Sequence, residues 1–224
     1  MLSPLIIYPY IVKIVGLELY GVVIFAQTIV TYFSLVINFG FGTSGPRDVA
    51  ISRGNHSLLS EYVSSIFIIK TVLWIICFII YIIVVSTIDF LNDHLLLFIF
   101  TYFVTIGDVL FPRWFFQGIE KMKYITYINI SVRSLFIIAI FIFIKQRSDY
   151  IYIPLFNSIG SLLSGIIAIF IVFKIEGISF ISVPKEVLIK KFKENLVFFV
   201  STISIQVYIN LNKIIVGTFL GMKE

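Results

Sequence analysis

The sequence predicts an all-α, polytopic membrane protein with about six to seven transmembrane helices, and three observations carry that prediction. Hydrophobic residues make up 59% of the 224 residues and charged residues only 13%, about half the share usual in soluble domains. The mean hydropathy is +1.07. Apolar runs recur that exceed the roughly 18 residues typical of a spanning helix. Backbone groups in lipid must bond within their own segment, so helices are expected.

The expected segments follow one another along the whole chain. The first, at 1–12, contains Pro4 and Pro9 and resembles the second half of a helix, because it is too short to span a bilayer. The complete segments are expected at 20–41, 62–86, 94–111, 124–144, 151–173 and 196–220. Tyrosine and tryptophan mark many of their ends, as in the aromatic belts of membrane interfaces. The abrupt start and end predict a truncated chain or a fragment of a longer one.

The distribution of Lys and Arg predicts the orientation. The loops after the second, fourth and sixth segments hold ten of them, and the alternate loops hold three. Cytoplasmic loops are the basic ones, so the N-terminus is predicted to be cytoplasmic. The net charge of +5 is then explained by topology and membrane lipid, with no need for nucleic acid. The polar stretch 174–195 is either an amphipathic segment on the membrane surface, starting near Val183, or a solvated basic loop.

Three cations lie well inside apolar runs: Lys70, Arg133 and Lys213. An ionised side chain costs about 3 kcal/mol at the centre of a membrane helix. We therefore expect Arg133 and Lys213 to face a water-filled or protein-lined interior. Lys70 is nearer the end of its segment, so its amine could equally reach the interface by snorkelling.

Polar residues form stripes on four of the segments, because residues three and four apart share a helix face. The stripes are Gln27, Thr31, Ser34 and Asn38; Thr101, Thr105 and Asp108; Thr126, Asn129 and Arg133; and Thr202, Gln206, Asn210 and Lys213. Four such helices could surround a hydrophilic cavity. The alternative for the uncharged members is hydrogen bonding between helices. The sixth segment instead has small residues at Gly160, Ser161, Ser164 and Gly165, which predicts close helix packing.

Signatures of an enzyme or a metal site are missing from the sequence. Cys77 is the single cysteine, and His56 and His94 fall in separate predicted loops, so neither a disulfide within the chain nor a Cys-based metal site is expected. No nucleophile elbow, phosphate-binding loop or zinc-protease motif occurs. The loops opposite the cytoplasm are too short for a glycan polymerase. We therefore expect a protein that is not an enzyme.

Three motifs carry a resemblance to a known family. They are VGLELYG at 15–21, FGFGTSGPRDVA at 39–50 and PRWFFQGIEKM at 112–122. The third motif is the most specific of the three. The residues that carry the resemblance are Gly40 of the second motif and, in the third, Trp114, Phe115, Phe116, Gln117, Gly118 and Glu120. The sequence resembles the O-antigen flippases, polysaccharide-biosynthesis transporters of the multidrug/oligosaccharidyl-lipid/polysaccharide exporter superfamily. The three aromatic residues of the motif are expected to anchor a cytoplasmic turn at the interface.

The resemblance implies a fold and an activity. The fold would be the first lobe of a twelve-helix, two-lobe transporter: a lobe at 1–173, a basic cytoplasmic linker at 174–195 and the first helix of the second lobe at 196–224. The activity would be transfer of undecaprenyl-pyrophosphate-linked oligosaccharide, the O-antigen repeat unit, to the periplasmic leaflet of the bacterial inner membrane. Alternating access driven by H⁺ or Na⁺ would need no other cofactor, and an O-antigen polymerase and a chain-length regulator would be partners.

The expected roles follow from the stripes and the resemblance together. Arg133 and Lys213 are the candidates for binding the pyrophosphate. The uncharged substrate-binding candidates are Gln27, Asn38, Asn129, Gln206 and Asn210, and the gating or coupling candidates are Arg47, Asp48, Lys70 and Asp108. Two alternatives remain open: a membrane scaffold or inactive remnant that does not transport, and an exporter of other amphiphiles.

Overall fold

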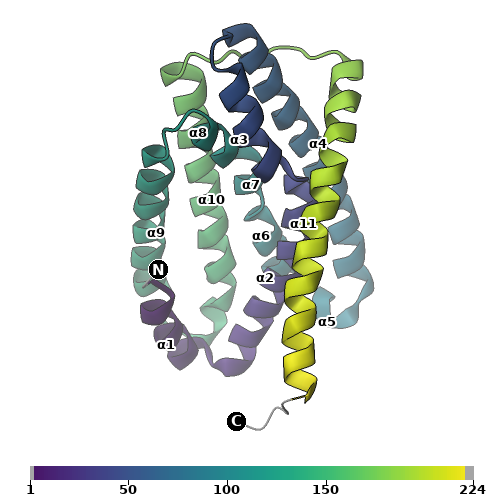
Figure 1. The fold of residues 1–224 in the computed structure, drawn as a ribbon. Helices are drawn as coiled ribbons and strands as arrows, with labels where there is room; N and C mark the ends of the chain where they lie inside the picture. The colour runs from purple at the N-terminus through teal and green to yellow at the C-terminus, as the bar shows by residue number, and fades with distance from the viewer. Residues whose placement is uncertain (1–2, 220–224) are drawn as a thin grey trace.

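The structure, a computed structural model, describes the backbone of residues 3–219 and the side chains of residues 7–206. Within that part the chain is a bundle of helices that run up and down side by side (Figure 1). The α-helices are α1 Ser3–Val15, α2 Leu17–Asn38, α3 Phe41–Ser52, α4 His56–Thr87, α5 Asp89–Asn92, α6 Leu95–Phe103, α7 Ile106–Leu110, α8 Arg113–Gly118, α9 Lys123–Phe143, α10 Tyr152–Phe170 and α11 Lys185–Phe219. A 3₁₀ turn, η1, spans Arg147–Ile151, and a π-helix, η2, spans Ile171–Ile175.

Five helical stretches among the described residues are long and apolar enough to cross a membrane. They are Leu17–Ser52, His56–Thr87, Leu95–Gly118, Lys123–Phe143 and Arg147–Ile175. Their helical geometry satisfies the backbone within each segment, as hydrocarbon requires. The prediction of an all-α, polytopic membrane protein is therefore confirmed.

Several expected loops are only breaks between consecutive helices. The loop expected at 13–19 reduces to Gly16, whose φ of 88° is readily available only to glycine. The loop after the second segment is a left-handed elbow at Phe39 and Gly40, with φ of 42° and 77°, from which α3 starts at once. The sequence-based boundary at residue 41 was wrong for this reason.

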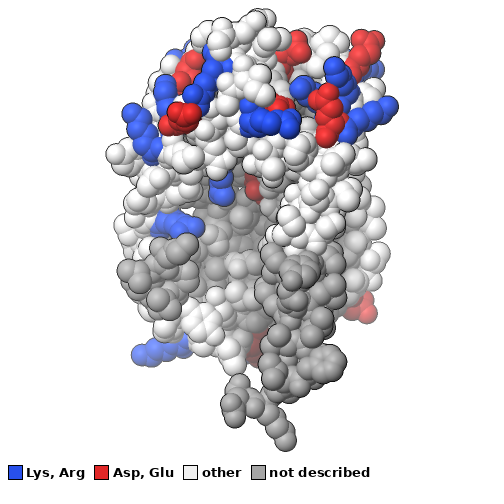
Figure 2. Space-filling view, viewed as in Figure 1, with Lys and Arg blue, Asp and Glu red and all other residues white. Residues whose placement is uncertain are grey.

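The hydrogen bonds and ion pairs separate two ends of the bundle. At one end Arg53 pairs with Glu120 at 3.1 Å and Lys121 with Glu176 at 2.7 Å. At the other end Arg147 pairs with Glu18 at 2.7 Å. Figure 2 shows charged side chains gathered at the first of these ends, at the top of the view. The strongly basic loops thus share one end, and its assignment to the cytoplasm stays a prediction.

The motif aromatics lie in the core at this charged end. Trp114, Phe115 and Phe116 on α8 are at most 3% exposed and belong to a cluster formed with α3, α4 and α10. The prediction that they anchor a turn at the membrane interface was wrong. A Cβ on Gly45 of α3 would lie 2.8 Å from the Cβ of Trp114, so α3 and α8 pack closer than side chains would otherwise allow.

The connection after α10 differs from both alternatives for 174–195. Residues 177–184 have no regular secondary structure, and the backbone N–H groups of Ser179 and Ile181 donate to Ser60 Oγ and Ser64 Oγ of α4 at 3.2 and 3.0 Å. From Lys185 onward the chain is one continuous helix, α11. Residues 185–195 therefore form the first turns of a long helix and are neither a separate amphipathic segment nor a loop.

Helix α11 is seated on the elbow between α2 and α3. The ring of Phe39 is stacked between Phe192 and Phe199, with centroid distances of 4.3 and 4.7 Å. Ser44 Oγ donates a hydrogen bond to the buried Oδ1 of Asn195. A Cβ on Gly40 would lie 2.7 Å from the Cβ of Phe198. The stacked rings thus hold Phe39 in a backbone conformation that is uncommon outside glycine.

Candidate functional site

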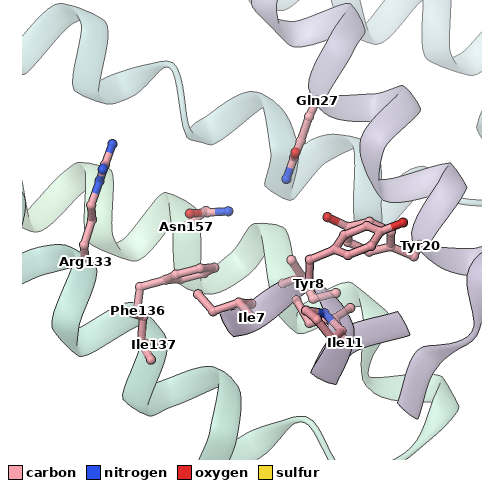
Figure 3. Close-up of a pocket in the computed structure, with 11 residues that line it drawn as sticks. Ile7, Tyr8, Ile11, Tyr20, Gln27, Arg133, Phe136, Ile137 and Asn157 are labelled. Atoms are coloured by element: carbon pink, nitrogen blue, oxygen red, sulfur yellow. The ribbon is translucent and has the colours of Figure 1, made fainter. Parts of the chain in front are cut away.

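The main hollow of the described bundle lies among α1, α2, α9 and α10 and extends toward α6 and α7. It consists of three adjoining pockets of about 560, 250 and 170 Å³. All three pockets are lined in part by Asn157 of α10, so they meet at this side chain. Figure 3 shows the largest pocket, with the amides of Gln27 and Asn157 directed into the same space. Residues of three of the four predicted polar stripes, those on α2, on α6 and α7, and on α9, line the hollow.

One side of the hollow carries positive charge. Arg133 on α9 lines the 560 Å³ and the 170 Å³ pockets, and Arg113 at the start of α8 lines the smaller one. Asn129, one helical turn from Arg133, lines the smaller pocket as well. Among the described residues, Arg133 has neither an ion pair nor a hydrogen bond, and its side chain is exposed to the hollow. A guanidinium with several free donors in fork geometry is suited to an oxyanion such as a phosphate.

The α10 side of the hollow was missed by the sequence-based assignment of sites. Asn157, Ser161 and Ser164 line the 170 Å³ pocket beside Arg133. Their offsets of 0, 4 and 7 are those of the other stripes, so a signal was present. The expected close packing is also found, since a Cβ on Gly165 would lie 2.5 Å from the Cβ of Leu110. Helix α10 therefore both packs closely and faces the cavity.

The opposite side of the hollow carries an acid. Asp108 on α7 lines the 250 Å³ pocket together with Gln27, Thr31 and Ser34 of α2. Ser34 Oγ donates a hydrogen bond to Oδ2 of Asp108. Thr31 Oγ1 donates to the carbonyl of Gln27 in its own helix at 2.8 Å. Two of the predicted stripes, on the second and fourth segments, thus meet at this wall.

Behind this acidic wall lies a buried amine. Lys70 on α4 is 2% exposed, and its Nζ donates to Oδ1 of Asn38 at 2.8 Å. Asn38 Nδ2 in turn donates to the carbonyl of Ser34 at 2.9 Å. Lys70 also interacts electrostatically with Asp108 and Arg113. The amine is therefore held in the protein interior rather than at the interface, which decides between the two alternatives for Lys70.

The remaining predicted site residues lie elsewhere. Arg47 and Asp48 on α3 pair at 2.8 Å at the charged end, and the Arg47 guanidinium lies 5.4 Å above the ring centre of Phe198 on α11. Gln206 is half-buried on α11 and does not line the hollow formed by the described residues. Asn210 and Lys213 lie outside the residues whose side chains the structure describes.

The motif after Pro112 joins α8 to α3. The carbonyl of Gly118 accepts hydrogen bonds from Nε of Arg53 at 2.7 Å and from its NH2 group. Glu120, with φ of 60°, pairs with the same arginine, whereas Gln117 is exposed. At Gly118 and Glu120 the motif is therefore structural and lies outside the hollow, whereas Arg113 of the same motif lines the 170 Å³ pocket.

The lining of the hollow indicates what kind of ligand it suits. Among the described residues, no group of three or more His, Cys, Asp or Glu side chains is close enough to hold a metal ion. The hollow combines a cationic side, an acidic side and amides between them. Such a lining suits a large polar ligand with an anionic part.

Comparison with known proteins identifies a family and two relatives of this chain. The family model described as "Polysaccharide biosynthesis protein" matches residues 1–224. A Shigella dysenteriae protein named "Putative O-antigen transporter" is 29% identical over 98% of this chain and 55% of its own length. An Escherichia coli K12 protein of the same name is 27% identical over 98% of this chain and 53% of its own. The chain spans about half the length of these curated relatives. No solved structure gives a significant match.

Proposed function

This chain belongs to the polysaccharide biosynthesis protein family, and from that premise we propose that it forms one wall of a flippase for lipid-linked oligosaccharide. The proposed substrate is an undecaprenyl-pyrophosphate-linked repeat unit of O-antigen type, moved from the cytoplasmic to the periplasmic leaflet. The names of the two relatives support transport of O-antigen over an enzymatic role. Because the chain spans about half of each relative, a second wall would come from further chain or from a second copy.

The observation that carries the proposal is Arg133 in the hollow. A cation at membrane depth is costly unless it serves a ligand or a partner. Arg133 lines two pockets, one of which Arg113 and Asn129 also line. No acid among the described residues forms an ion pair with Arg133. We propose that these three side chains bind the pyrophosphate, whose oxygens accept several charge-assisted hydrogen bonds. Lys213 is proposed as a further cation from the facing helix.

The proposed mechanism is alternating access. Helix α11 is held to the elbow at one end by Phe39, Ser44 and Asn195. We propose that this joint keeps the two lobes together while the hollow opens first to one leaflet and then to the other. The exposed pair Arg47–Asp48 is the proposed gate at the charged end, and Lys70 with Asp108 is the proposed coupling pair for H⁺ or Na⁺.

The test is replacement of Arg133 in a version extended to twelve helices, expressed in a bacterium that lacks its own flippase but makes a matched repeat unit. We expect Arg133→Ala to lower surface O-antigen about tenfold or more, because a hydrogen bond to a charged group contributes about 1.5–3 kcal/mol. Arg133→Lys should restore part of the activity. The matched control is Arg147→Ala, which removes an exposed arginine paired with Glu18; neither residue lines the hollow.

The outcome separates the flippase from its alternatives. Full surface O-antigen from Arg133→Ala at normal membrane abundance would refute the anion site. A scaffold predicts that Arg133→Ala changes only assembly or abundance. An exporter of other amphiphiles predicts that the unsubstituted extended protein fails to restore O-antigen although it is inserted.

A further inference from the structure

The hollow is divided by charge, and the division has a chemical consequence for the ligand. The pocket with Arg113, Arg133 and Asn129 and the pocket with Asp108, Thr31 and Gln27 share Asn157 as their common lining residue. A diphosphate bound at the arginines would therefore lie next to the pocket of Asp108, with Asn157 between them. In a lipid-linked oligosaccharide one phosphate carries the lipid and the other the first sugar, and of these two groups the sugar suits a pocket lined by Asp108, Thr31 and Gln27. This step rests on the proposed function.

We infer that the wall around Asp108 is a sugar subsite that accepts neutral or amino-bearing sugars and discriminates against acidic ones. Asp108 is the residue that sets this specificity. Its carboxylate lines the pocket, and Ser34 is bonded to one of its two oxygens. The other oxygen has no bond of this kind to a described residue and is available to a ligand. Because an ionised carboxylate only accepts hydrogen bonds, it can bind a sugar hydroxyl or ammonium group.

The hydroxyl groups on this wall strengthen the same preference. Thr31 and Thr101 donate their hydroxyl hydrogens to carbonyls of their own helices at 2.8 and 2.7 Å. Thr105 donates to the carbonyl of Tyr102 at 2.7 Å and accepts from Trp74 at 2.9 Å. The hydrogens of these hydroxyls are therefore unavailable to a ligand, so the wall offers mainly acceptors. The carboxylate of a uronate also only accepts hydrogen bonds, so on this wall it would meet other acceptors and few donors.

Two amides supply the donors that a neutral sugar also needs. Gln27 and Asn157 point into the hollow (Figure 3), and neither has a hydrogen-bond partner among the described residues. Each amide both donates and accepts, as sugar hydroxyls do. At the far end of the hollow the rings of Tyr8 and Tyr20, 5.2 Å apart, add flat apolar surface. The pocket of about 560 Å³ is large enough for sugars beyond the first.

The buried amine does not cancel this acidic character. Lys70 Nζ is directed to Asn38 and does not line the pocket. Its amine therefore lies behind the wall, beside Asn38, and not in the pocket itself. A ligand in the hollow therefore meets the carboxylate directly and the ammonium only through Asn38 and Ser34.

The test is binding of two matched probes to the full 224-residue chain in lipid nanodiscs. One probe is a short polyprenyl diphosphate carrying an N-acetylhexosamine, and the other is the same lipid carrying a hexuronate. We expect the unsubstituted chain to prefer the first about tenfold or more, since the hexuronate carboxylate would face the like charge of Asp108. Asp108→Asn should bring the two affinities to within about twofold of one another. The control Asp93→Asn changes an exposed acid outside the hollow.

A second variant keeps the test decisive if Asp108→Asn does not fold. Gln27→Glu adds a carboxylate of the same shape on the same side of the hollow and should increase the preference for the neutral sugar. Equal binding of both probes by the unsubstituted chain, with Arg133 still required, would overturn the sugar subsite alone. Binding of both probes that is unaffected by Arg133→Ala would instead refute the proposed function.

Discussion

Adding one methyl group to Gly118 should disrupt the joint between α3 and α8. A Cβ built on Gly118 would lie 2.5 Å from both Cβ and Cγ1 of Val49 and 2.9 Å from the carbonyl oxygen of Pro46. Rotation of the valine side chain would move Cγ1 but not its Cβ, and the carbonyl belongs to the α3 backbone. Gly118→Ala can therefore be accommodated only if the two helices move apart.

The size of the effect can be worked out from these contacts. Overpacking a close-packed core costs about 1–3 kcal/mol, and the upper end applies because two of the three atoms cannot move independently. For a chain of this length each kcal/mol lowers the unfolding temperature by about 2–4 °C. We therefore expect Gly118→Ala to lower that temperature by about 6–12 °C.

The assay is thermal unfolding of the purified chain in detergent, followed by loss of the monodisperse size-exclusion peak. The control is Gly42→Ala on α3, where a new Cβ would meet nothing within 4 Å. Alanine is the better helix former by up to about 1 kcal/mol, so Gly42→Ala should be neutral or stabilising. If Gly118→Ala unfolds at the same temperature as Gly42→Ala, the close approach of α3 and α8 is wrong.

Two further predictions concern polar contacts. Lys70→Met should destabilise the chain by about 2–3 kcal/mol, because Oδ1 of Asn38 loses its buried charged donor. Asp108→Asn combined with it should cost less than the two single changes summed; strict additivity in thermal unfolding would contradict the electrostatic contact. At the charged end, the hydrogen bonds to Glu176 raise the pKa of Lys121. This stabilisation is complete below the ordinary lysine pKa of about 10.4 and is lost as pH rises through the raised pKa. It amounts to about 1 kcal/mol at most, because the Lys121 side chain is 45% exposed. Glu176→Gln should remove this pH dependence, and a pH titration of the unfolding temperature measures it.

The sequence was sufficient for the helices and for several polar residues that line the hollow, but not for the apolar and aromatic lining contributed by α1. Long apolar runs left little alternative to membrane-spanning helices, and the offsets of 3 and 4 brought Gln27, Asp108 and Arg133 to one hollow. Asn157 was missed although its stripe with Ser161 and Ser164 was visible, because the small residues around it were assigned to packing alone. The same helix face does both here.

Other features depend on contacts that are distant in sequence. Phe39 adopts a left-handed conformation because rings of α11 stack on it. The sequence around residue 39 does not predict this contact. Trp114 is typical of an interfacial residue by its position, yet the space left by Gly45 buries it. Aromatic residues at a helix end are equally compatible with either environment until the neighbouring helix is placed.

The contact between α11 and the elbow at Phe39 and Gly40 has a consequence for how the protein is made. Ser44 and Asn195, which form a hydrogen bond in this contact, are 151 positions apart. At synthesis rates of 5–20 residues per second, the elbow would precede its partner by roughly 8 to 30 s. The Phe39 ring and the surface over Gly40 would be exposed inside the membrane during that interval. We expect the nascent chain to need shielding by the insertion machinery until α11 leaves the ribosome.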